Sequence, residues 1–388
     1  MDINKEIINI YKEIVEIRRN LHMYPELGYE EVETPKKIEK LLKEMGIETE
    51  SNIGGNGIVG YLNRGKRGKT IALRADFDAL PIQEKNKISY SSKNNGKMHA
   101  CGHDGHTAIL LGAAKLLSKQ KEELQGEIRF LFQPAEEKAP VGGALAMIED
   151  GAIDDVDRIL GLHIWPTLEK NKIFFKKGAE MASSDPLKIK IYGVSSHASE
   201  PENGIDSTLI GAQVLNNLQT IISRNIGPLE SGVITIGKFT SGKAYNVISD
   251  EAILEGTVRT LNAKTKTKIK NKIYDVVQGI CSAHGAKCEI EYTDGYTPVV
   301  VNEDVFEELR NSIIKNIGKD FFKELESPFL GGEDFGRYLE KVPGALVFLG
   351  SKDGNSYPLH HPNFNFDENI MKLGVKFFIT SVKSLLNN

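Results

Sequence analysis

Apolar residues along the chain follow recognisable spacings, and each spacing predicts a kind of element. Near the N-terminus they recur at alternating steps of four and three, at Ile3, Ile7, Ile10, Ile14, Ile17 and Leu21. This period places the apolar side chains on one face and predicts an amphipathic helix. A second helix is predicted between Thr34 and Gly46, because Thr34 can cap it, Pro35 suits its first turn and Gly46 suits its end.

Short and continuously apolar runs of buried-strand type follow these helices. They are KTIALRA (69–75), GEIRFLF (126–132), RILGLHI (158–164) and GALVFLG (344–350). Helical patterns, such as Thr107–Leu117 and Gly143–Glu149, lie between the runs. Strands that alternate with helices predict an α/β fold, a mostly parallel mixed sheet with helices on both faces.

The middle of the chain has a different order of elements. It predicts strand 187–194, helix 206–223, strands 231–239 and 252–259, helix 263–281 and strand 287–292. The order β-α-β-β-α-β is that of a ferredoxin-like α+β module. We therefore expect a first segment of the larger domain at 1–183, an inserted domain at 184–295 and a second segment at 296–388.

Composition excludes several classes of protein. The 388 residues carry a net charge of −4, and no concentrated basic stripe favours binding to nucleic acid. No apolar run approaches the length of a membrane span, and the N-terminus lacks the apolar core of a secretory signal. The three cysteines are odd in number and scattered, which does not indicate a disulfide framework. The expected compartment is the cytoplasm.

Polar residues follow four of the predicted core strands directly, at the ends where ligands bind in open α/β sheets. Asp76 and Asp78 follow the first run, Gln133, Glu136 and Glu137 the second, His163 falls near the end of the third, and His360 with His361 follows the fourth. One edge of the sheet would thus collect carboxylates and imidazoles.

A further cluster lies in MHACGHDGHTAIL (98–110), where a helix is predicted to begin. His99, Cys101, His103 and His106 fall within eight positions. We interpret His99 and His106 as surface or capping residues, and Cys101 and His103 as part of the sheet edge. Thiolate, imidazole and carboxylate together hold zinc-like divalent ions, so the sequence predicts a metal site.

The adjacent glutamates Glu136 and Glu137 can have different roles. Side chains alternate in extended backbone, so the two carboxylates point in different directions. One can bind metal while the other remains a general base, and a pair of divalent ions can activate water for hydrolysis.

The chain also resembles a known family. In order along the sequence stand RRNLHMYPELGYEE, LRADFDALP, MHACGHDGHTA, FQPAEE, GLHIWP, SSHASEP, NVISDEAILEGTVRT, GGEDFG and LHHPNFNFDE. These segments are similar to motifs of the aminoacylase and hippurate hydrolase family of dinuclear metallopeptidases, in the subgroup of auxin-conjugate (indole-acetyl amino acid) amidohydrolases. The resemblance extends from about Arg18 to Glu368.

The resemblance implies a two-domain hydrolase with two divalent metal ions, Mn²⁺ or Zn²⁺ with Co²⁺ or Ni²⁺ as alternatives, and a lid domain that forms a homodimer. It implies the metal ligands Cys101, His103, Glu137, His163 and His360, the general base Glu136, and the substrate-binding residues Asn246 and Arg259. His197 matches a lid histidine that completes the neighbouring subunit's site.

The sequence departs from the family pattern at three places. Glu202 stands where a histidine often follows the lid proline, and Ser249 stands where a proline is usual. His361 stands where asparagine or serine is common, so His360 and His361 compete for one ligand role. The first two departures concern contacts of the lid with the substrate.

Together these observations predict a metal-dependent amidohydrolase that cleaves N-acyl amino acids into a carboxylic acid and a free amino acid. Within this class, the alternatives are a deacetylase of N-acetyl-diaminopimelate in lysine biosynthesis and a hydrolase of small peptides. A metal-binding protein without catalysis is the alternative from another class. The pair of Glu136 and Glu137 argues against it, because a storage site needs ligands but no free base.

Overall fold

A computed structural model of the chain describes residues 2–354 and 356–387, which form two compact units. The core unit comprises Met1–Glu180, Val300–Ser327 and Asp334–Asn388, and the inserted unit comprises Met181–Val299 and Pro328–Glu333. The predicted insert, 184–295, falls inside the inserted unit. The short segment 328–333 was assigned to the larger domain by sequence, but Phe329 pairs with Met181 and Ala182 and so joins the inserted unit.

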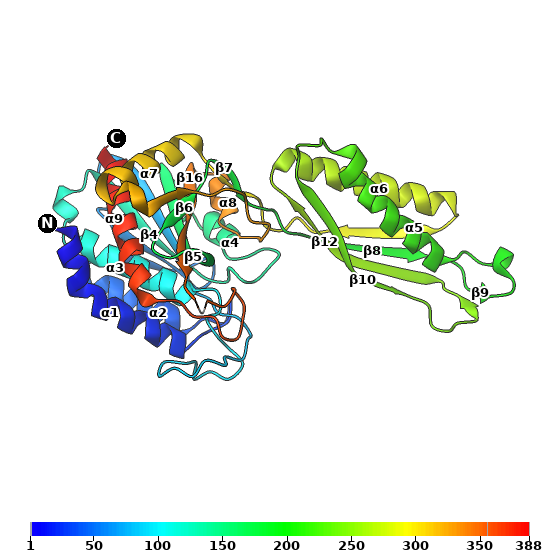
Figure 1. Cartoon of the computed structure of the whole chain (residues 1–388), viewed down its shortest axis with the longest axis horizontal. Helices are drawn as coiled ribbons and strands as arrows, with labels where there is room; N and C mark the ends of the chain where they lie inside the picture. Colours follow the sequence, from blue (N-terminus) through cyan, green and yellow to red (C-terminus); the bar gives the residue numbers. More distant parts are fainter. Residues whose placement is uncertain (1, 355, 388) are drawn as a thin grey trace. The chain divides into compact units, whose positions relative to one another are not determined.

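The core unit is built on one mixed sheet of eight strands (Figure 1). Their bounds are Glu48–Ile53 (β1), Gly57–Leu62 (β2), Lys69–Asp76 (β3), Gly126–Gln133 (β4), Arg158–Glu169 (β5), Ile173–Phe175 (β6), Phe322–Glu324 (β15) and Gly344–Lys352 (β16). The order across the sheet is β1-β2-β4-β3-β5-β16-β6-β15. The central strands β4, β3, β5 and β16 are parallel to one another, and the β1–β2 hairpin joins β4 antiparallel.

Helices cover both faces of this sheet, which confirms the predicted fold class. The helices of the core unit are Ile3–Met23 (α1), Glu33–Glu44 (α2), His103–Ser118 (α3), Ala144–Glu149 (α4), Glu303–Asn316 (α7), Gly336–Leu339 (α8) and Met371–Asn387 (α9). Helices α1, α3 and α9 pack on one another, and α4 and α8 lie on the opposite side of the sheet (Figure 1). On β5, Leu160, Leu162 and Ile164 face the main apolar core, whereas Gly161 faces Phe335 beside α8.

The start of α2 corrects one detail of the sequence analysis. Thr34 lies inside the helix and does not cap it. The carboxylate of Glu26 instead accepts the N–H groups of Val32, Glu33 and Thr34 at 2.8–3.1 Å. A side chain from an earlier loop therefore caps the free end of the helix, and the local sequence does not show this.

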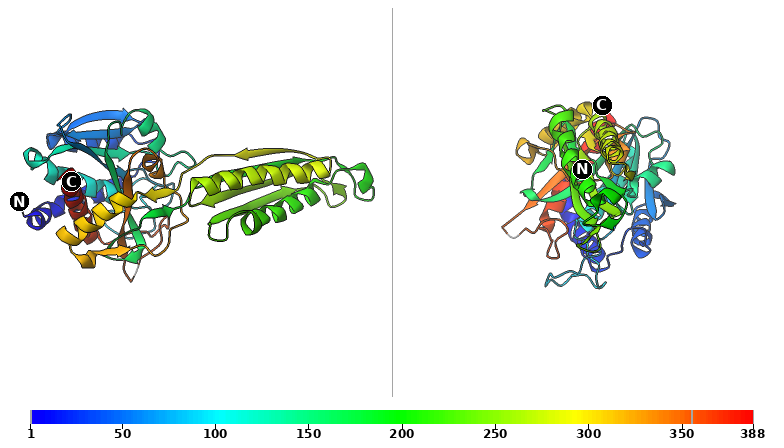
Figure 2. Two further views of the ribbon diagram at one scale, coloured as in Figure 1. Left: turned by 90° about the horizontal axis from the view of Figure 1, so that it is seen from above. Right: turned by 90° about the vertical axis from the view of Figure 1, so that its right-hand side faces the viewer.

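The inserted unit is a four-stranded antiparallel sheet with two helices on one face (Figures 1 and 2). Its elements are Asp185–Tyr192 (β8), Ser207–Thr220 (α5), Gly232–Ser241 (β10), Glu251–Thr260 (β12), Ala263–Ala283 (α6) and Lys287–Tyr292 (β13). The sheet order is β10-β12-β8-β13. This is the β-α-β-β-α-β order that the sequence predicts, folded as a ferredoxin-like module.

Four short strands complete the structure. Ser196–His197 (β9) and Val247–Ile248 (β11) pair with each other in the inserted unit, and Gly178–Met181 (β7) and Val299–Val301 (β14) lie where the chain passes between units. In the ranges 2–354 and 356–387, no helix is both long enough and apolar enough to span a membrane.

Candidate metal centre

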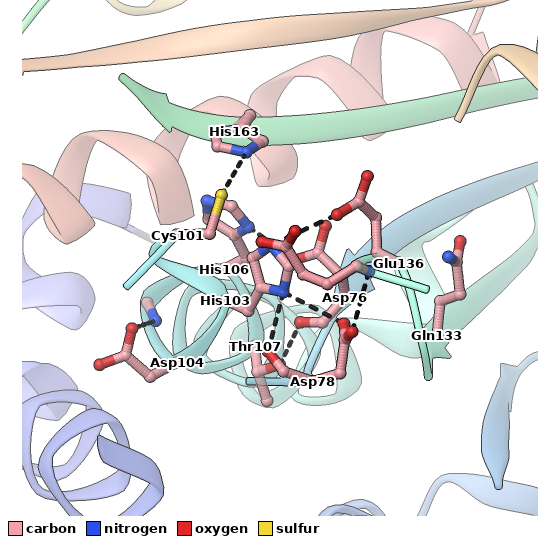
Figure 3. Close-up of polar contacts among 12 residues, drawn as sticks. Asp76, Asp78, Cys101, His103, Asp104, His106, Thr107, Gln133, Glu136 and His163 are labelled. Carbon is pink, nitrogen blue, oxygen red and sulfur yellow. Dashed lines mark hydrogen bonds and ion pairs between the residues drawn. The ribbon is translucent and has the colours of Figure 1, made fainter. Parts of the chain in front are cut away.

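The carboxyl ends of the parallel strands bring the predicted ligands together, in an arrangement that we call the ligand edge. It consists of Cys101, His103, Glu136, Glu137, His163 and His360. The two glutamates follow β4, His163 lies on β5, His360 lies in the loop after β16, and Cys101 and His103 stand at the start of α3. Figure 3 shows Cys101, His103, Glu136 and His163 converging on one volume.

Distances within the ligand edge are those of groups that could share ions. The Cys101 Sγ and His163 Nε2 atoms are 3.6 Å apart, and the His360 Nε2 and Glu137 Oε1 atoms are 3.1 Å apart. His103 Nε2 lies 3.9 Å from Glu136 Oε2 and 4.0 Å from Glu137 Oε1. One atom from each of Cys101, His103 and His163 lies within 4.8 Å of the others, and so does one from each of Cys101, Glu137 and His360.

The backbone fixes which nitrogen of each buried histidine faces the centre. His103 Nδ1 is 2.9 Å from the Asp78 carbonyl oxygen, and His163 Nδ1 is 2.8 Å from the Ile164 carbonyl oxygen. A carbonyl can only accept, so each Nδ1 carries a hydrogen, and in the neutral ring, the form that binds metal, each Nε2 has a lone pair. Among the described residues, His103 Nε2 is buried without a hydrogen-bond partner. Both Nε2 atoms are therefore prepared to bind a cation.

Charges around the edge also favour a cation. Burial lowers the pKa of His103, but the negative charges of Asp76 and Asp78 outweigh burial and raise it to about 10. Burial, together with the charges of Glu137 and Glu136, raises the pKa of the Cys101 thiol well above its ordinary value. Both shifts reflect a negative field, in which a thiolate is stable only beside a positive ion.

Spacing and donor chemistry fit a zinc-like divalent ion. With metal–sulfur and metal–nitrogen bonds of about 2.3 and 2.0 Å, two ligands of a tetrahedral ion lie about 3.5 Å apart. The separation of 3.6 Å between Cys101 Sγ and His163 Nε2 matches this value. The lone pair of His103 Nε2 would also gain a partner.

The turn that carries the two glutamates is held from both sides. Ala135 adopts a left-handed conformation with φ of 57°, and its N–H donates to Glu31 Oε1 at 3.0 Å. The N–H of Glu137 donates to Asp78 Oδ2 at 2.9 Å. Since left-handed backbone is uncommon for alanine, these carboxylates stabilise a turn that the chain would rarely adopt alone. Glu136 and Glu137 follow this turn, and one carboxylate oxygen of each lies within 4.8 Å of the other and of a His103 ring nitrogen.

The structure distinguishes the two adjacent histidines after β16. His360 lies next to Glu137, and its own backbone has a φ of 63°. The His361 ring is stacked on Tyr357 at 4.5 Å, and its Nδ1 accepts the N–H of Asn363 at 3.0 Å. Of this pair, His360 is the residue that contributes to the ligand edge.

The candidate residues of the inserted unit are at two separate places. His197 and Asn246 are exposed and adjoin the β9–β11 pair, which we call the tip together with residues 242–246. His197 Nδ1 accepts from the N–H of Ser199 at 3.2 Å, so Nε2 is the nitrogen that carries hydrogen in the neutral ring. Arg259 lies near the other end of β12, half-buried, with Nη1 bonded to Thr257 Oγ1 and the Val258 carbonyl oxygen.

Two interpretations from the sequence were wrong. His99 and His106 are 2% and 1% exposed, so neither is a surface residue. Asp76 and Asp78 were predicted to lie at the sheet edge without a specific role, and Arg74 and Asp334 were not predicted to belong to the site. All four side chains are at most 1% exposed and belong to the polar network below the ligand edge. All four lie within LRADFDALP and GGEDFG, two of the segments that resemble family motifs, although neither segment shows that the side chains are buried partners.

Comparisons with known proteins agree with this geometry. The model of peptidase family M20/M25/M40 matches residues 72–384. An N-acetyl-L-cysteine deacetylase of Bacillus subtilis is 41% identical over 97% of this chain and 89% of its own length. A thermostable carboxypeptidase of Saccharolobus solfataricus is 40% identical over 96% of both chains, and the hippurate hydrolase of Campylobacter jejuni is 38% identical over 97% and 98%.

A solved structure is similar over nearly the whole chain. It is a dinuclear metal-binding peptidase of the M20 family from Bacillus subtilis, with 33% sequence identity and a TM-score of 0.85. The similarity covers 98% of this chain and 99% of that one, so it includes both units.

Proposed function

The chain belongs to peptidase family M20/M25/M40, and from this premise we propose that it is a metal-dependent N-acyl amino acid amidohydrolase. It would cleave the amide bond to give a carboxylic acid and a free amino acid. The observation that carries the proposal is the ligand edge, where a thiol, imidazoles and two carboxylates meet. The names of relatives that hydrolyse N-acyl amino acids support the substrate class.

In this proposal two divalent ions, Mn²⁺ or Zn²⁺ with Co²⁺ or Ni²⁺ as alternatives, are held by five residues: Cys101, His103, Glu137, His163 and His360. When bound, such ions polarise the scissile carbonyl and make water a better nucleophile. The lone pairs on the Nε2 atoms of His103 and His163 and the contact of His360 with Glu137 support these assignments.

Glu136 is the general base. It is 6% exposed, and its Oε2 lies 3.9 Å from His103 Nε2, so it adjoins the ligands without replacing one. Glu136 takes a proton from the attacking water and passes it to the leaving amine nitrogen. With Glu137 assigned as a ligand, the neighbouring carboxylate of Glu136 is the one that we assign to proton transfer.

In this proposal the lid supplies His197, whose Nε2–H would donate to the carbonyl oxygen as negative charge develops. Asn246 and Arg259 bind the substrate, with the guanidinium of Arg259 on the α-carboxylate. From Glu251 to Arg259 a strand extends by about 26 Å, and His197 lies beyond the Glu251 end. An N-acyl amino acid is much shorter than this span, so one substrate could contact both His197 and Arg259 only if they come from two chains.

A homodimer through the inserted unit is therefore part of the proposal. Exposed apolar side chains at the tip, among them Tyr245 and Val247, would be covered in such an assembly. The proposed compartment is the cytoplasm, where a cysteine ligand stays reduced. The proposed binding partner besides the second subunit is the small-molecule substrate, and we propose no binding to nucleic acid or membrane.

The decisive experiment is a hydrolysis screen of N-acetyl, N-benzoyl and indole-acetyl amino acids with Mn²⁺, Zn²⁺, Co²⁺ or Ni²⁺. We expect hydrolysis of at least one class, loss of activity on chelation, and recovery on metal return. Small peptides and N-acetyl-diaminopimelate belong in the same screen. The carboxypeptidase relative makes peptides the second candidate substrate class. A protein that binds metal and hydrolyses none of these amides would contradict the proposal.

A further inference from the structure

The imidazole of His106 lies beside the ligand edge, with its ring centroid 5.4 Å from that of His103 and 4.6 Å from that of His163, yet both of its nitrogens are already occupied. His106 Nδ1 is 2.7 Å from Asp76 Oδ1, and His106 Nε2 accepts the N–H of Ile164 at 2.8 Å (Figure 3 labels His106 and Asp76). A backbone N–H can only donate, so Nε2 is unprotonated and Nδ1 donates to Asp76. No lone pair is left for a metal ion. His106 therefore differs in role from His103 and His163.

The Asp76 side of this contact is rigid. Arg74 Nη1 donates to Asp76 Oδ2 at 2.5 Å, and Arg74 Nη2 donates to Asp334 Oδ1 at 2.9 Å. Arg74 Nε donates to Gln133 Oε1 at 2.9 Å. Arg74, Asp76 and Asp334 are at most 1% exposed, so these charge-assisted bonds act without competition from water. The position of His106 is thus set from below by a fixed carboxylate.

The Ile164 side of this contact is next to a proposed ligand. β3 pairs with β5 only as far as Arg74 with Gly161, so the N–H of Ile164 lies beyond the last β3 partner. His106 Nε2 supplies the missing acceptor. The Ile164 carbonyl accepts from His163 Nδ1 at 2.8 Å, and the His106 and His163 ring centroids are 4.6 Å apart. His163 is therefore fixed by three contacts. His106 binds the Ile164 N–H of the peptide bond that follows His163, the Ile164 carbonyl accepts from His163 Nδ1, and the His106 ring packs against the His163 ring.

We propose that His106 is a positioning residue of the metal centre. It links Asp76 to the main chain at Ile164 and so holds His163 Nε2 at its place opposite Cys101 Sγ. The inference rests on the proposed function, in which His163 and Cys101 bind metal. It adds that the acceptor at His106 Nε2, and not the size of the ring alone, determines the affinity for that ion.

Three substitutions separate the contacts of His106. In His106→Gln, the side-chain oxygen can still reach the Ile164 N–H, whereas in His106→Asn the shorter amide can serve only Asp76. His106→Phe keeps a ring and removes both contacts. His99→Phe is the matched control, because His99 is also buried nearby and its ring nitrogens have no hydrogen-bond partner in the described part of the chain.

The measurement uses full-length protein stripped by a chelator and reloaded with Co²⁺ alone. Affinity is measured by competition with a chromophoric chelator, and the cobalt–thiolate absorption band reports the ion bound by Cys101. We expect His106→Asn and His106→Phe to bind that ion about 10–100-fold more weakly, with a shifted band. His106→Gln and His99→Phe should remain within about threefold of the wild-type affinity.

Thermal unfolding of the metal-free proteins identifies variants that are merely unstable. Wild-type affinity and band in a folded His106→Phe would overturn the inference, and so would an equal loss of affinity in His99→Phe. If His106→Phe does not fold, the comparison of His106→Gln with His106→Asn decides, and equal affinities would overturn it. Wild-type protein that binds Co²⁺ but hydrolyses no amide would contradict the proposed function and still allow these affinities to be compared.

Discussion

The ligand edge of the core unit and the tip of the inserted unit hold their polar side chains in opposite ways. At the ligand edge His103 and His163 are 1% and 4% exposed, and each Nδ1 donates to a fixed carbonyl. At the tip His197 is exposed, and its ring contacts Ser199, two residues away. Tyr245 beside it is fully exposed.

This difference corresponds to two ways of making a site. The ligand edge is completed when the core unit folds, because its geometry depends on contacts within one unit. Burying so many polar groups is costly unless each is paired, and this explains the dense network of carboxylates. The tip has no such network among the described residues, so in the proposed dimer its geometry would be completed by another surface. Removing a metal ligand at the edge should thus weaken metal binding, whereas changes at the tip should affect turnover alone.

The largest effect is expected at the two glutamates of the ligand edge. Glu136→Gln should lower kcat by about 10²–10⁴-fold with both metal ions retained, because only proton transfer is lost. Glu137→Gln should lose metal, since it removes a charged ligand. Metal content by elemental analysis and kcat on one substrate check both statements. Equal metal loss in the two variants would mean that the base is wrongly assigned.

The next effect is expected at the tip. His197→Ala should lower kcat by about 10²–10³-fold, the range typical of a lost oxyanion donor. Its unfolding free energy should stay within about 0.5 kcal/mol of wild type, because the side chain is exposed. Denaturant titration and steady-state kinetics measure the two quantities. If His197→Ala lowered the unfolding free energy well beyond about 0.5 kcal/mol, the fall in kcat could be explained by unfolding, and His197 would be a structural residue.

Subunit mixing tests whether His197 acts across chains. Inactive Glu136→Gln dimers and inactive His197→Ala dimers are allowed to exchange. Half of the dimers should then be mixed, with one intact site of two, and activity should recover to about a quarter of wild type. Native mass spectrometry confirms the exchange. Exchange without any recovery would show that His197 does not complete a partner's site.

The same contrast explains which parts could be predicted from sequence. The strands that carry the ligands, β3, β4, β5 and β16, are buried and continuously apolar, so the sequence marks them clearly. In the β1–β2 hairpin, which was not predicted, β1 has the polar sequence ETESNI and lies half-exposed at the sheet edge, whereas β2, GIVGYL, is apolar and buried and was missed. A long continuously apolar run identifies a central strand of the sheet. An edge strand forms because of its packing against a neighbouring strand, which the local sequence does not show.

For the site, residue type identified the ligands but not their supports. Arg74 and Asp334 are 260 positions apart in sequence and 2.9 Å apart in the structure. A charged residue normally lies at the surface, so nothing local marks these two as buried partners. His106 was misinterpreted for the same reason. Its acceptor role depends on where β3 stops pairing with β5, and only the folded sheet shows that.

A smaller effect should separate the adjacent histidines after β16. His360→Asn should weaken metal binding at least about 10-fold, because His360 lies 3.1 Å from Glu137 and is a proposed ligand. His361→Asn should stay within about threefold, since its ring stacks on Tyr357 outside the ligand edge. Competition with a chromophoric chelator measures both affinities. The reverse ranking would move the ligand role to His361.

The smallest expected effect is a pH dependence of stability at Glu31, which holds the turn before the two glutamates of the ligand edge. Burial, aided by the charge of Asp78, raises the pKa of Glu31 from 4.5 to about 7, although Asn56 and the Ala135 N–H oppose the shift. A raised pKa means that the folded protein binds the proton more tightly than the unfolded chain. The stability from protonated Glu31 is therefore fully present below about pH 4.5 and is lost as pH rises through about 7.

Glu31→Gln should remove this dependence, because the amide oxygen can still accept the Ala135 N–H and the side chain no longer titrates. Relative to the variant, the wild type should lose up to about 3 kcal/mol of unfolding free energy between pH 5 and pH 8, at 1.36 kcal/mol per pKa unit. Denaturant titrations of chelator-treated proteins across this range measure the difference. Glu30→Gln, an exposed neighbour paired with Lys97, is the control and should follow the wild-type slope. If the unfolding free energies of wild type and Glu31→Gln change with pH in the same way, the prediction is wrong. That result would show that folding does not raise the pKa of Glu31.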